Sequence, residues 1–242
     1  MNIVSFSGGK DSTAMLLMML EKGIPIDRVI CVDTTKEFPA MYPHIEKIQK
    51  MIEPLKIEIV KIDFDYWFSD HVIQGGKFQG EKGRSWPDWR VRWCTGLKSQ
   101  AISHLKHNVV YNPRIEKYYN GNEEDIIEFH GIAFDEQERI GKNKLNKRKC
   151  EIKYPLVDWG ITEKQALEYC YVKGFDWDGL YEKFHRVSCW CCPLSRIGEL
   201  KVLYNDFPEL WKELQEMDKK TFRKFRNDYS VAELTERFAK EG

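Results

Sequence analysis

The sequence predicts an α/β fold, in which a doubly wound, mostly parallel sheet carries helices on both faces and is followed by a helical C-terminal part. Three observations lead to this prediction. Strand-like and helical segments alternate through the first half, a glycine-rich turn joins the first strand to the first helix, and helix-capping signals recur after residue 161. Strands that alternate with helices are typical of βαβ units with right-handed crossovers, and therefore of a parallel sheet.

The first half contains the predicted strands. They are expected at residues 3–6, 28–32, 57–62 and 126–132, with helices over 13–20, 41–51 and 95–105. Ligands of such sheets bind beyond the carboxyl ends of the strands. We therefore expect the turn after the first strand, the end of the second strand and the segment after residue 132 to line one crevice.

The chain after residue 160 is predicted to be mostly helical. Thr162 with Gln165, and Ser230 with Glu233, fit the capping box that opens a helix, and Gly174 suits a helix C-terminus. We therefore expect two parts, an α/β domain over residues 1–160 and a mostly helical part over 161–242.

Length and composition favour a globular enzyme. The chain has 242 residues, of which 42% are hydrophobic and 13% aromatic, enough for a sizeable core. Its 38 basic residues balance its 38 acidic ones, so any basic surface must be local. We find no apolar run of transmembrane length and no secretory leader, and we expect a cytoplasmic protein without a membrane partner.

The strongest functional signal is a six-residue turn made of Ser7, Gly8, Gly9, Lys10, Asp11 and Ser12. A glycine-rich turn that opens a helix presents backbone N–H groups and the positive end of the helix dipole to an anion. The glycines allow close approach, the lysine can reach a phosphate oxygen, and the serines offer hydroxyl donors. Val4 and Asp11 exclude a Walker A motif. The turn therefore predicts a phosphate site.

Four of the seven cysteines form a second chemical signal. Cys189, Cys191 and Cys192 make a C-x-x-C motif followed by proline, and Cys94 lies at a predicted helix N-terminus, where a thiolate is stabilised. Thiolates at this spacing can hold one metal centre. Spacing alone leaves open a [4Fe-4S] cluster, a zinc ion or reduced structural thiols. The other three, Cys31, Cys150 and Cys170, are expected in the core or on the surface.

A basic run lies between residues 142 and 149, and its members are Lys142, Lys144, Lys147, Arg148 and Lys149. A solvated loop is one interpretation of this run, and contact with phosphate or nucleic acid is the other.

Several segments together resemble the phosphoadenosine phosphosulfate (PAPS) reductase family of the N-type ATP pyrophosphatase, or PP-loop, superfamily, over residues 1–195. The turn at 7–12 resembles the S-G-G-x-D-S pyrophosphate loop of that superfamily. The other matching segments are D-T-T-K-E-F-P at 33–39, R-W-C-T-x-x-K at 92–98, G-I-A-F-D-E at 131–136 and Y-P-L-V-D-W at 154–159. The resemblance implies an adenine nucleotide alpha hydrolase-like fold and a nucleotide site in the first 160 residues.

Roles at the phosphates follow from the turn and from this resemblance. The glycine amides and Lys10 are expected to hold the β- and γ-phosphates of ATP and to stabilise the departing pyrophosphate. Asp11, with Asp135 or Glu136, is the expected Mg²⁺ site, because Mg²⁺ prefers carboxylates together with phosphate oxygens. Gly131, which begins the same segment as the two acidic residues, is also expected at the nucleotide. A simple turn at a strand end is the alternative for Asp135 and Glu136.

Further residues are expected at the rest of the nucleotide and at the second substrate. Asp33 and Thr34 are expected to face the ribose and adenine. Arg90, Arg92 and Lys98 are expected to bind the α-phosphate or the second substrate, with surface charge as the alternative for the arginines.

The resemblance also bears on the cysteines. In cluster-bearing members of the family, a Cys-Cys pair and a later C-x-x-C bind a [4Fe-4S] cluster. Here Trp93-Cys94 provides one cysteine of that pair, so the resemblance implies that Cys191 supplies the fourth ligand or that the cluster keeps an open iron.

Two departures bear on the activity. Reductases of this family attack the sulfonucleotide with a cysteine of the C-terminal tail, and no cysteine follows Cys192 here. The intact loop also favours ATP over a sulfonucleotide. We therefore expect cleavage of ATP to pyrophosphate and an adenylated acceptor, coupled to iron–sulfur-dependent sulfur transfer, as in the DNA phosphorothioation and tRNA thiolation enzymes.

Two alternatives stay open. One is reduction of PAPS or adenosine phosphosulfate, and the other is a nucleotide-binding Fe–S accessory protein of a nucleic-acid modification complex. The expected partners are an unidentified acceptor, for which nucleic acid is one option, and a sulfur or electron donor protein. A homo-oligomer is compatible with the sequence.

Overall fold

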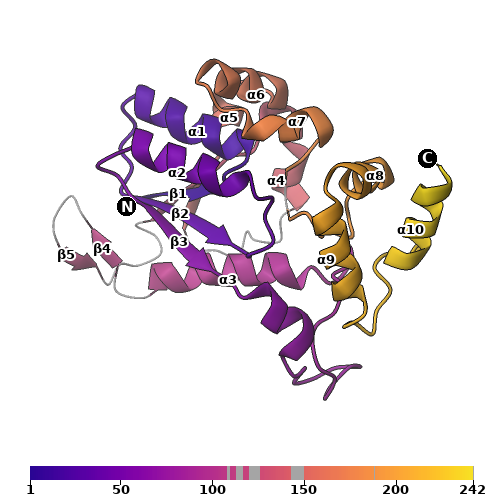
Figure 1. The fold of residues 1–242 in the computed structure, drawn as a ribbon. Coiled ribbons are helices and arrows are strands. Elements are labelled where there is room, and N and C mark those ends of the chain that lie inside the picture. The colour runs from indigo at the N-terminus through magenta and orange to yellow at the C-terminus, as the bar shows by residue number, and fades with distance from the viewer. Residues whose placement is uncertain (108–109, 113–116, 120–125, 143–149, 188, 242) are drawn as a thin grey trace. The chain divides into compact units, whose positions relative to one another are not determined.

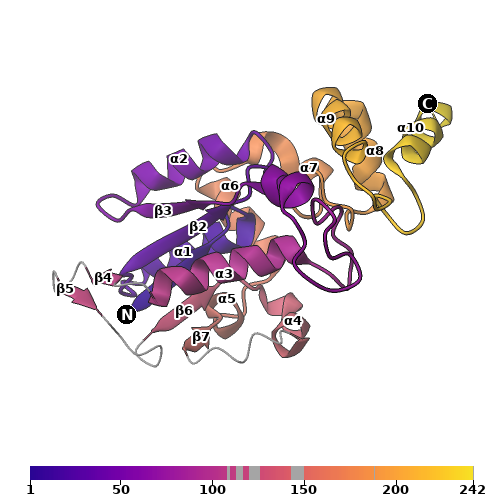
Figure 2. The same cartoon turned by 90° about the horizontal axis from the view of Figure 1, so that it is seen from below.

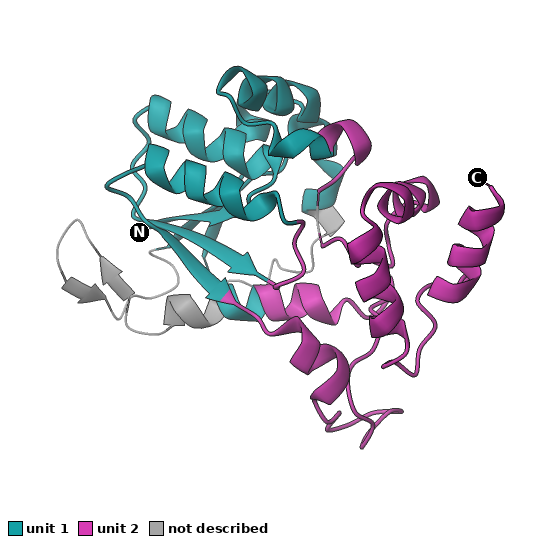
Figure 3. Ribbon diagram, in the orientation of Figure 1, with its two compact units in different colours: residues 1–33, 39–60, 99–180 teal, residues 34–38, 61–98, 181–242 magenta. Residues whose placement is uncertain are grey.

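The computed structural model describes residues 1–107, 110–112, 117–119, 126–142, 150–187 and 189–241. The chain forms two compact units, each built from several stretches of sequence (Figure 3). Unit 1 comprises residues 1–33, 39–60 and 99–180, and unit 2 comprises residues 34–38, 61–98 and 181–242. The domain boundary expected near residue 160 stays a prediction.

Unit 1 is built on a parallel sheet of five strands in the order β3-β2-β1-β6-β7 (Figure 1). The strands are β1 (Asn2–Phe6), β2 (Arg28–Asp33), β3 (Ile57–Lys61), β6 (Ile127–His130) and β7 (Glu151–Lys153). Val4 of β1 pairs with Val29 on one side and with Phe129 on the other. The predicted α/β fold with a parallel sheet is confirmed, and β7 is an addition, too short to leave a hydrophobic pattern.

The strand order places a topological switch point beside β1. The chain leaves β1 toward β2 and β3 on one side, and continues with β6 and β7 on the other. In open α/β sheets, ligands bind at the carboxyl ends of the strands where the order reverses. The carboxyl ends of β1 and β6 are therefore the expected place for a ligand.

Helices cover both faces of this sheet (Figures 1 and 2). On one face lie α1 (Lys10–Glu21) and α2 (Met41–Met51), and α6 (Glu163–Val172) packs beside α1. The opposite face is covered by the part of α3 (Trp93–His107) that belongs to unit 1, where Ile102 packs against Ile3 and Ile30. The predicted helices on both faces are confirmed.

The first helix begins earlier than the sequence predicts. Gly9 has extended backbone angles (φ −77°, ψ 167°) and is the N-cap, so Lys10, Asp11 and Ser12 form the first turn of α1. The predicted start at Thr13 was therefore wrong. The physical reason is that only the two glycines are needed to turn the chain from strand to helix.

The capping signals of unit 1 behave as predicted. Thr162 and Gln165 form a capping box at the start of α6, and Gly174, with φ +80°, follows its last turn. The short elements of this unit are β4 (Val110–Asn112), β5 (Lys117–Tyr119), η3 (Phe134–Glu136), α4 (Glu138–Lys142), α5 (Pro155–Asp158) and η5 (Trp177–Gly179).

Unit 2 is mainly helical, with an aromatic core. Its elements include η1 (Tyr66–Asp70), α7 (Leu180–Lys183), α8 (Ile197–Asp206), α9 (Pro208–Asp218) and α10 (Val231–Lys240). The Trp86 ring lies 4.6 Å from that of Phe68 and 4.9 Å from that of Phe225, centroid to centroid. Ser230 and Glu233 form the second predicted capping box. Across the described part of the chain, every helix is too short or too polar to cross a membrane.

Candidate functional site

The predicted phosphate turn connects β1 to α1 in unit 1. Gly8 has φ +77°, and a Cβ there would lie 2.9 Å from the Cε atom of Met41, so glycine alone suits the position. The hydroxyl of Ser12 donates to the Gly9 carbonyl at 3.0 Å and lies 3.0 Å from that of Ser7. These contacts close the turn, and no side chain caps α1. The positive end of the helix dipole therefore lies at the switch point of the sheet.

Lys10 lies buried in the first turn of α1. Its side chain is 7% exposed, and its Nζ donates to Glu163 Oε1 at 2.7 Å and to Asp11 Oδ2 at 3.2 Å. Two carboxylates therefore hold the ammonium group beside the helix N-terminus. Glu163 comes from the first turn of α6, which joins the site through the packing of α6 on α1.

Three carboxylates converge at the same place. Asp11, Glu136 and Glu163 each offer an oxygen within 4.8 Å of the other two. Asp11 Oδ1 is buried without a hydrogen-bond partner in the described structure. Burial, opposed by Lys10 and reinforced by the other two carboxylates, raises the pKa of Asp11 to about 6. A divalent cation would satisfy this oxygen and offset the repulsion, so the donor set fits Mg²⁺.

The segment after β6 reaches this cluster through a close backbone contact. A Cβ on Gly131 would lie 2.7 Å from the backbone nitrogen of Ser12, so the chain passes directly over the first turn of α1. The η3 turn then places Glu136 in the acidic cluster. Asp135 instead accepts a hydrogen bond from the backbone N–H of Glu163 at 2.9 Å. Of the two acidic residues expected at the metal, Glu136 is the one placed with Asp11.

A buried histidine and a tryptophan support the turn. Trp177 Nε1 donates to the Gly8 carbonyl at 2.8 Å, and its ring lies 4.4 Å from that of His44. His44 Nε2 lies 3.0 Å from the hydroxyl of Thr13 on α1. Trp177 has φ +50°, a costly backbone angle for a bulky residue. This strained turn keeps the indole against the phosphate turn.

His44 gives the stability of the protein a defined pH dependence. Burial, assisted by Lys47, lowers the pKa of His44 from 6.5 to about 4. Between these values the unfolded chain binds a proton that the folded chain does not, so stability is full above pH 6.5 and falls as pH drops toward 4. At about 1.4 kcal/mol per pKa unit, the loss from His44 is about 3 kcal/mol.

We expect His44→Gln, which keeps a polar group for Thr13, to remove this dependence. Urea unfolding from pH 4 to 7.5 should show wild type losing stability relative to His44→Gln below pH 6.5, with a constant difference above pH 7. A difference that stays constant over the whole range would show that His44 is not held neutral by burial.

Asp33 and Thr34 end the second strand and enter different surroundings. Asp33 belongs to unit 1, where its side chain is buried and accepts a hydrogen bond from the Tyr42 hydroxyl at 3.4 Å. Thr34 belongs to unit 2, and its hydroxyl lies 3.3 Å from the Sγ atom of Cys189. Their predicted contacts with ribose and adenine stay predictions.

The C-x-C-C motif lies in unit 2, in a turn between α7 and α8. The backbone N–H of Cys192 donates to the Cys189 carbonyl at 3.2 Å, and that of Trp190 donates to the Lys36 carbonyl at 3.1 Å. Burial, reinforced by Glu37, raises the pKa of Cys189 to about 12. Burial also raises the pKa values of Cys191 and Cys192. The thiols are therefore neutral without a cation, and a bound metal would reverse this preference.

Glu37 ties two further predicted residues to the motif. Its Oε1 accepts hydrogen bonds from Lys98 Nζ at 3.0 Å and from the Thr34 hydroxyl at 2.9 Å. Cys94 lies in the first turn of α3. Burial raises the pKa of Cys192, Cys94 adds to this rise, and Arg92 opposes it. The structure therefore groups Thr34, Arg92 and Lys98 with the cysteines of unit 2.

The described sulfurs are not already arranged around a metal. Tetrahedral zinc with Zn–S bonds of about 2.3 Å needs its sulfurs about 3.8 Å apart. Among the described residues, the acidic cluster is the group in which three ligand atoms lie within 4.8 Å of one another, so no three of these sulfurs do. All four thiols are free. A [4Fe-4S] cluster and a zinc ion both stay predictions for these four cysteines.

The remaining cysteines lie apart from this motif. Cys31, Cys150 and Cys170 are buried, as expected for core residues. The basic run from residue 142 to residue 149 lies outside the residues whose side chains the structure describes.

Sequence reasoning missed Glu163, Glu37, His44 and Trp177. Glu163 had a usable signal, because the capping box at Thr162 places it in the first turn of a helix. Glu37 lies within the D-T-T-K-E-F-P segment, which could have drawn attention to it. His44 and Trp177 carry no local signal, since only packing brings them together.

The chain is an α/β protein with a glycine-rich turn at the switch point of its parallel sheet and a lysine and three carboxylates beside the helix that follows. Phosphate groups bind at such a helix N-terminus in other α/β proteins. The family model for the phosphoadenosine phosphosulfate reductase domain matches residues 1–195. The chain belongs to this family.

Two relatives align with most of this chain. An uncharacterized protein of Methanocaldococcus jannaschii is 26% identical over 226 residues, which cover 87% of this chain and 40% of the relative. An uncharacterized 37.8 kDa protein of Escherichia phage 186 is 22% identical over 86% of this chain and 71% of its own. This chain therefore spans less than half of the archaeal relative.

Among solved structures, the U34-tRNA thiolase from Methanococcus maripaludis with its [4Fe-4S] cluster aligns over 99% of this chain and 71% of its own. The TM-score is 0.40 and the sequence identity is 14%.

Proposed function

We propose that this protein binds ATP at the phosphate turn and cleaves it between the α- and β-phosphates, releasing pyrophosphate and adenylating an acceptor. The proposal is carried by one observation. The uncapped N-terminus of α1, buried Lys10 and the unpartnered Oδ1 of Asp11 gather at the switch point of the sheet. A phosphate anion would satisfy the helix N-terminus and Lys10, and a cation bound to that anion would satisfy the Asp11 oxygen.

The residues of the turn act on the leaving group. The α1 N-terminus and Lys10 stabilise the charge that grows on the departing pyrophosphate, and Gly8 keeps the backbone clear for close approach. Asp11, Glu136 and Glu163 would hold Mg²⁺, which supplies charge neutralisation at the phosphates when bound. Asp135 fixes the first turn of α6 and so positions Glu163.

The experiment uses α-labelled ATP and protein purified without oxygen. Incubation with RNA, DNA and metabolite fractions should yield AMP or adenylated acceptor together with pyrophosphate in equal amounts. Release of ADP and phosphate instead would show cleavage at the β–γ bond and would overturn the proposal.

The same proposal assigns the cysteines of unit 2 to sulfur transfer. Cys94, Cys189, Cys191 and Cys192 would hold a [4Fe-4S] cluster, which supplies electron-transfer and sulfur-carrying chemistry when bound. Glu37 and Thr34 position Cys189, whose Sγ donates to Glu37 Oε1 at 3.7 Å and lies 3.3 Å from the Thr34 hydroxyl. The coupling of this cluster to adenylation is part of the proposal.

We expect protein purified without oxygen to be brown and to contain about four iron and four sulfide per chain. Cys192→Ser should lose most of this iron, because one thiolate ligand is removed, whereas Cys150→Ala in the core of unit 1 should retain it. Iron and sulfide analysis with the visible spectrum checks both variants. One zinc per chain without visible absorbance would contradict the cluster.

Reduction of a sulfonucleotide is the second candidate, favoured by the family to which residues 1–195 belong. This reaction needs a nucleophilic thiol, and residues 193–242 contain no cysteine. Cys191 is 2% exposed. Thioredoxin-dependent sulfite release from PAPS, abolished by Cys191→Ser with the iron content unchanged, would establish this reaction in place of adenylation.

A further inference from the structure

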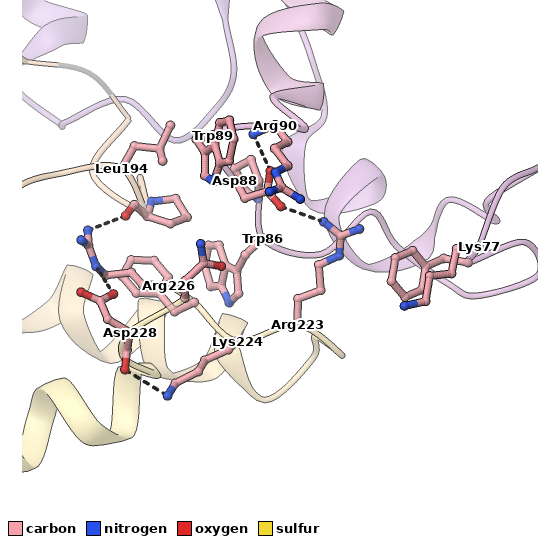
Figure 4. A pocket seen from close by; sticks show the side chains of 15 residues that line it. Lys77, Trp86, Asp88, Trp89, Arg90, Leu194, Arg223, Lys224, Arg226 and Asp228 are labelled. Atoms are coloured by element: carbon pink, nitrogen blue, oxygen red, sulfur yellow. Dashed lines mark hydrogen bonds and ion pairs between the residues drawn. The ribbon is translucent and has the colours of Figure 1, made fainter.

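Unit 2 contains a pocket of about 750 Å³ that the roles given under the proposed function do not use (Figure 4). Arg90, which the sequence places at the α-phosphate or the second substrate, lines this pocket. Residues 77–78, 86–90, 193–194 and 223–228 line it. Five of the lining residues are basic and two are acidic, which makes the pocket positive in a chain with no net charge. The basic residues are Lys77, Arg90, Arg223, Lys224 and Arg226.

Two of these cations form no ion pair within the described residues. The pKa of Asp88 is lowered mainly by the backbone N–H that Val91 donates to it, and the charge of Arg90 helps to lower it. Asp88 pairs with Arg223 at 3.7 Å, and Asp228 pairs with Arg226 at 3.0 Å. Arg90 and Lys77 make no ion pair with any residue in the described ranges. Exposed cations in a pocket with more basic than acidic residues attract an anionic ligand.

An exposed indole accompanies these charges. Trp89 is 61% exposed, which is unusual for the largest side chain, and the guanidinium carbon of Arg90 lies 4.6 Å from the centre of its ring. Figure 4 shows the two side chains together at one edge of the pocket. Asp88 Oδ1 accepts the backbone N–H groups of Arg90 and Val91, both at 2.7 Å, and this holds the segment in a turn. A fixed turn therefore presents an exposed aromatic ring together with an exposed cation.

The pocket adjoins the cysteine motif within unit 2. Pro193 and Leu194, which line the pocket, follow Cys192 directly. Arg226 Nη1 donates to the carbonyls of Pro193 at 2.6 Å and Ser195 at 2.7 Å. One wall of the pocket is therefore the segment that leaves the C-x-C-C turn.

We propose that this pocket binds single-stranded nucleic acid, with a base stacked on Trp89 and phosphates at Arg90 and Lys77, and that nucleic acid is the acceptor class. The second half of this statement rests on the proposed function. Cations spread along a groove beside an exposed aromatic ring are what single strands need, because bases supply the π-face and the backbone supplies repeated charge. A mononucleotide site would enclose its phosphate instead.

The test measures binding of fluorescein-labelled single-stranded RNA and DNA by anisotropy, without ATP. Trp89→Ala should weaken binding at least about fivefold and leave the salt dependence unchanged, because stacking is lost. Arg90→Ala should reduce the slope of log K against log salt by about 0.7, because one phosphate contact is lost. Tyr66→Ala and Lys219→Ala, exposed residues of unit 2 outside the pocket, should bind as wild type does.

Several outcomes would overturn the proposal. They are absence of binding, equal binding by Trp89→Ala and wild type, equal affinity for duplex, and Trp89-dependent binding of poly-glutamate, which would indicate an acidic protein partner. Lys10→Ala should bind the oligonucleotides normally, since Lys10 belongs to the phosphate turn. Oligonucleotide binding without pyrophosphate release would therefore refute the proposed adenylation and support the proposed nucleic-acid pocket. Pyrophosphate release without oligonucleotide binding would refute the pocket and support the adenylation.

Discussion

Replacing Lys10 with alanine is expected to lower ATP-dependent pyrophosphate release by about 100-fold or more. The side chain is the buried cation in the first turn of α1, 2.7 Å from Glu163 and 3.2 Å from Asp11. Without this side chain, the departing pyrophosphate loses a stabilising positive charge. The carboxylates of Asp11 and Glu163 would then face the pyrophosphate directly and repel it. Loss of one preorganised group that stabilises developing charge typically costs about 100- to 1,000-fold in rate.

Steady-state pyrophosphate release and calorimetric ATP titration would measure this effect. Lys22→Ala is a matched control, because Lys22 lies at the opposite end of α1 and contacts the ring of Trp159 instead. The control should keep wild-type activity. Unchanged ATP affinity and unchanged turnover in Lys10→Ala would remove the phosphate turn from the mechanism.

Gly131→Ala is expected to produce the second large effect, on both stability and nucleotide binding. The added Cβ would meet the backbone of Ser12 at 2.7 Å and 2.8 Å, closer than such atoms approach in real structures. Because these atoms belong to a helix, relief requires the whole first turn of α1 or the end of β6 to move. We expect about 1–3 kcal/mol of destabilisation, as for other overpacked positions, and weaker ATP binding.

Urea unfolding and ATP titration of the same variant would measure the two effects. Gly198→Ala serves as the control, because the residue is helical and no atom of a neighbouring segment lies within 4 Å of the place that its Cβ would take. The control should be as stable as wild type or more stable. A Gly131→Ala protein with wild-type stability would show that the two segments are not in the close contact described.

The two variants also separate chemistry from architecture. Lys10→Ala changes a charge while the turn keeps its shape, because Gly8 and the Ser7–Ser12 contact do not depend on it. Gly131→Ala changes the shape while every charged group remains. Loss of activity in both would place the reaction at the first turn of α1.

Local signals predicted much of this protein. The turn at 7–12 was predictable because glycine, lysine and serine act there through the backbone and through near neighbours. The capping boxes at Thr162 and Ser230 were predictable for the same reason, since each needs only residues three apart. The start of α1 was misplaced because polar residues in a first turn leave no apolar pattern.

The acidic cluster shows where local signals end. Asp11, with Asp135 or Glu136, was expected at a Mg²⁺ site from the turn and the family segment. Glu163 joins them only because α6 packs beside α1, and Asp135 is drawn away to the N-terminus of α6. These carboxylates come together because segments far apart in the sequence pack against one another. Sequence spacing alone therefore does not predict which of them share a site.

The sequence by itself determined the parallel α/β architecture and the phosphate turn, because periodicity, glycines and caps act over a few residues. It also restricted the cysteine set to metal-binding or structural roles. The tertiary structure decided which groups share a site. It placed Thr34 and Lys98 with Glu37 and Cys189, and left Trp89 and Arg90 exposed beside a pocket. These outcomes depend on burial and on contacts between segments far apart in the chain, which only the folded protein brings together.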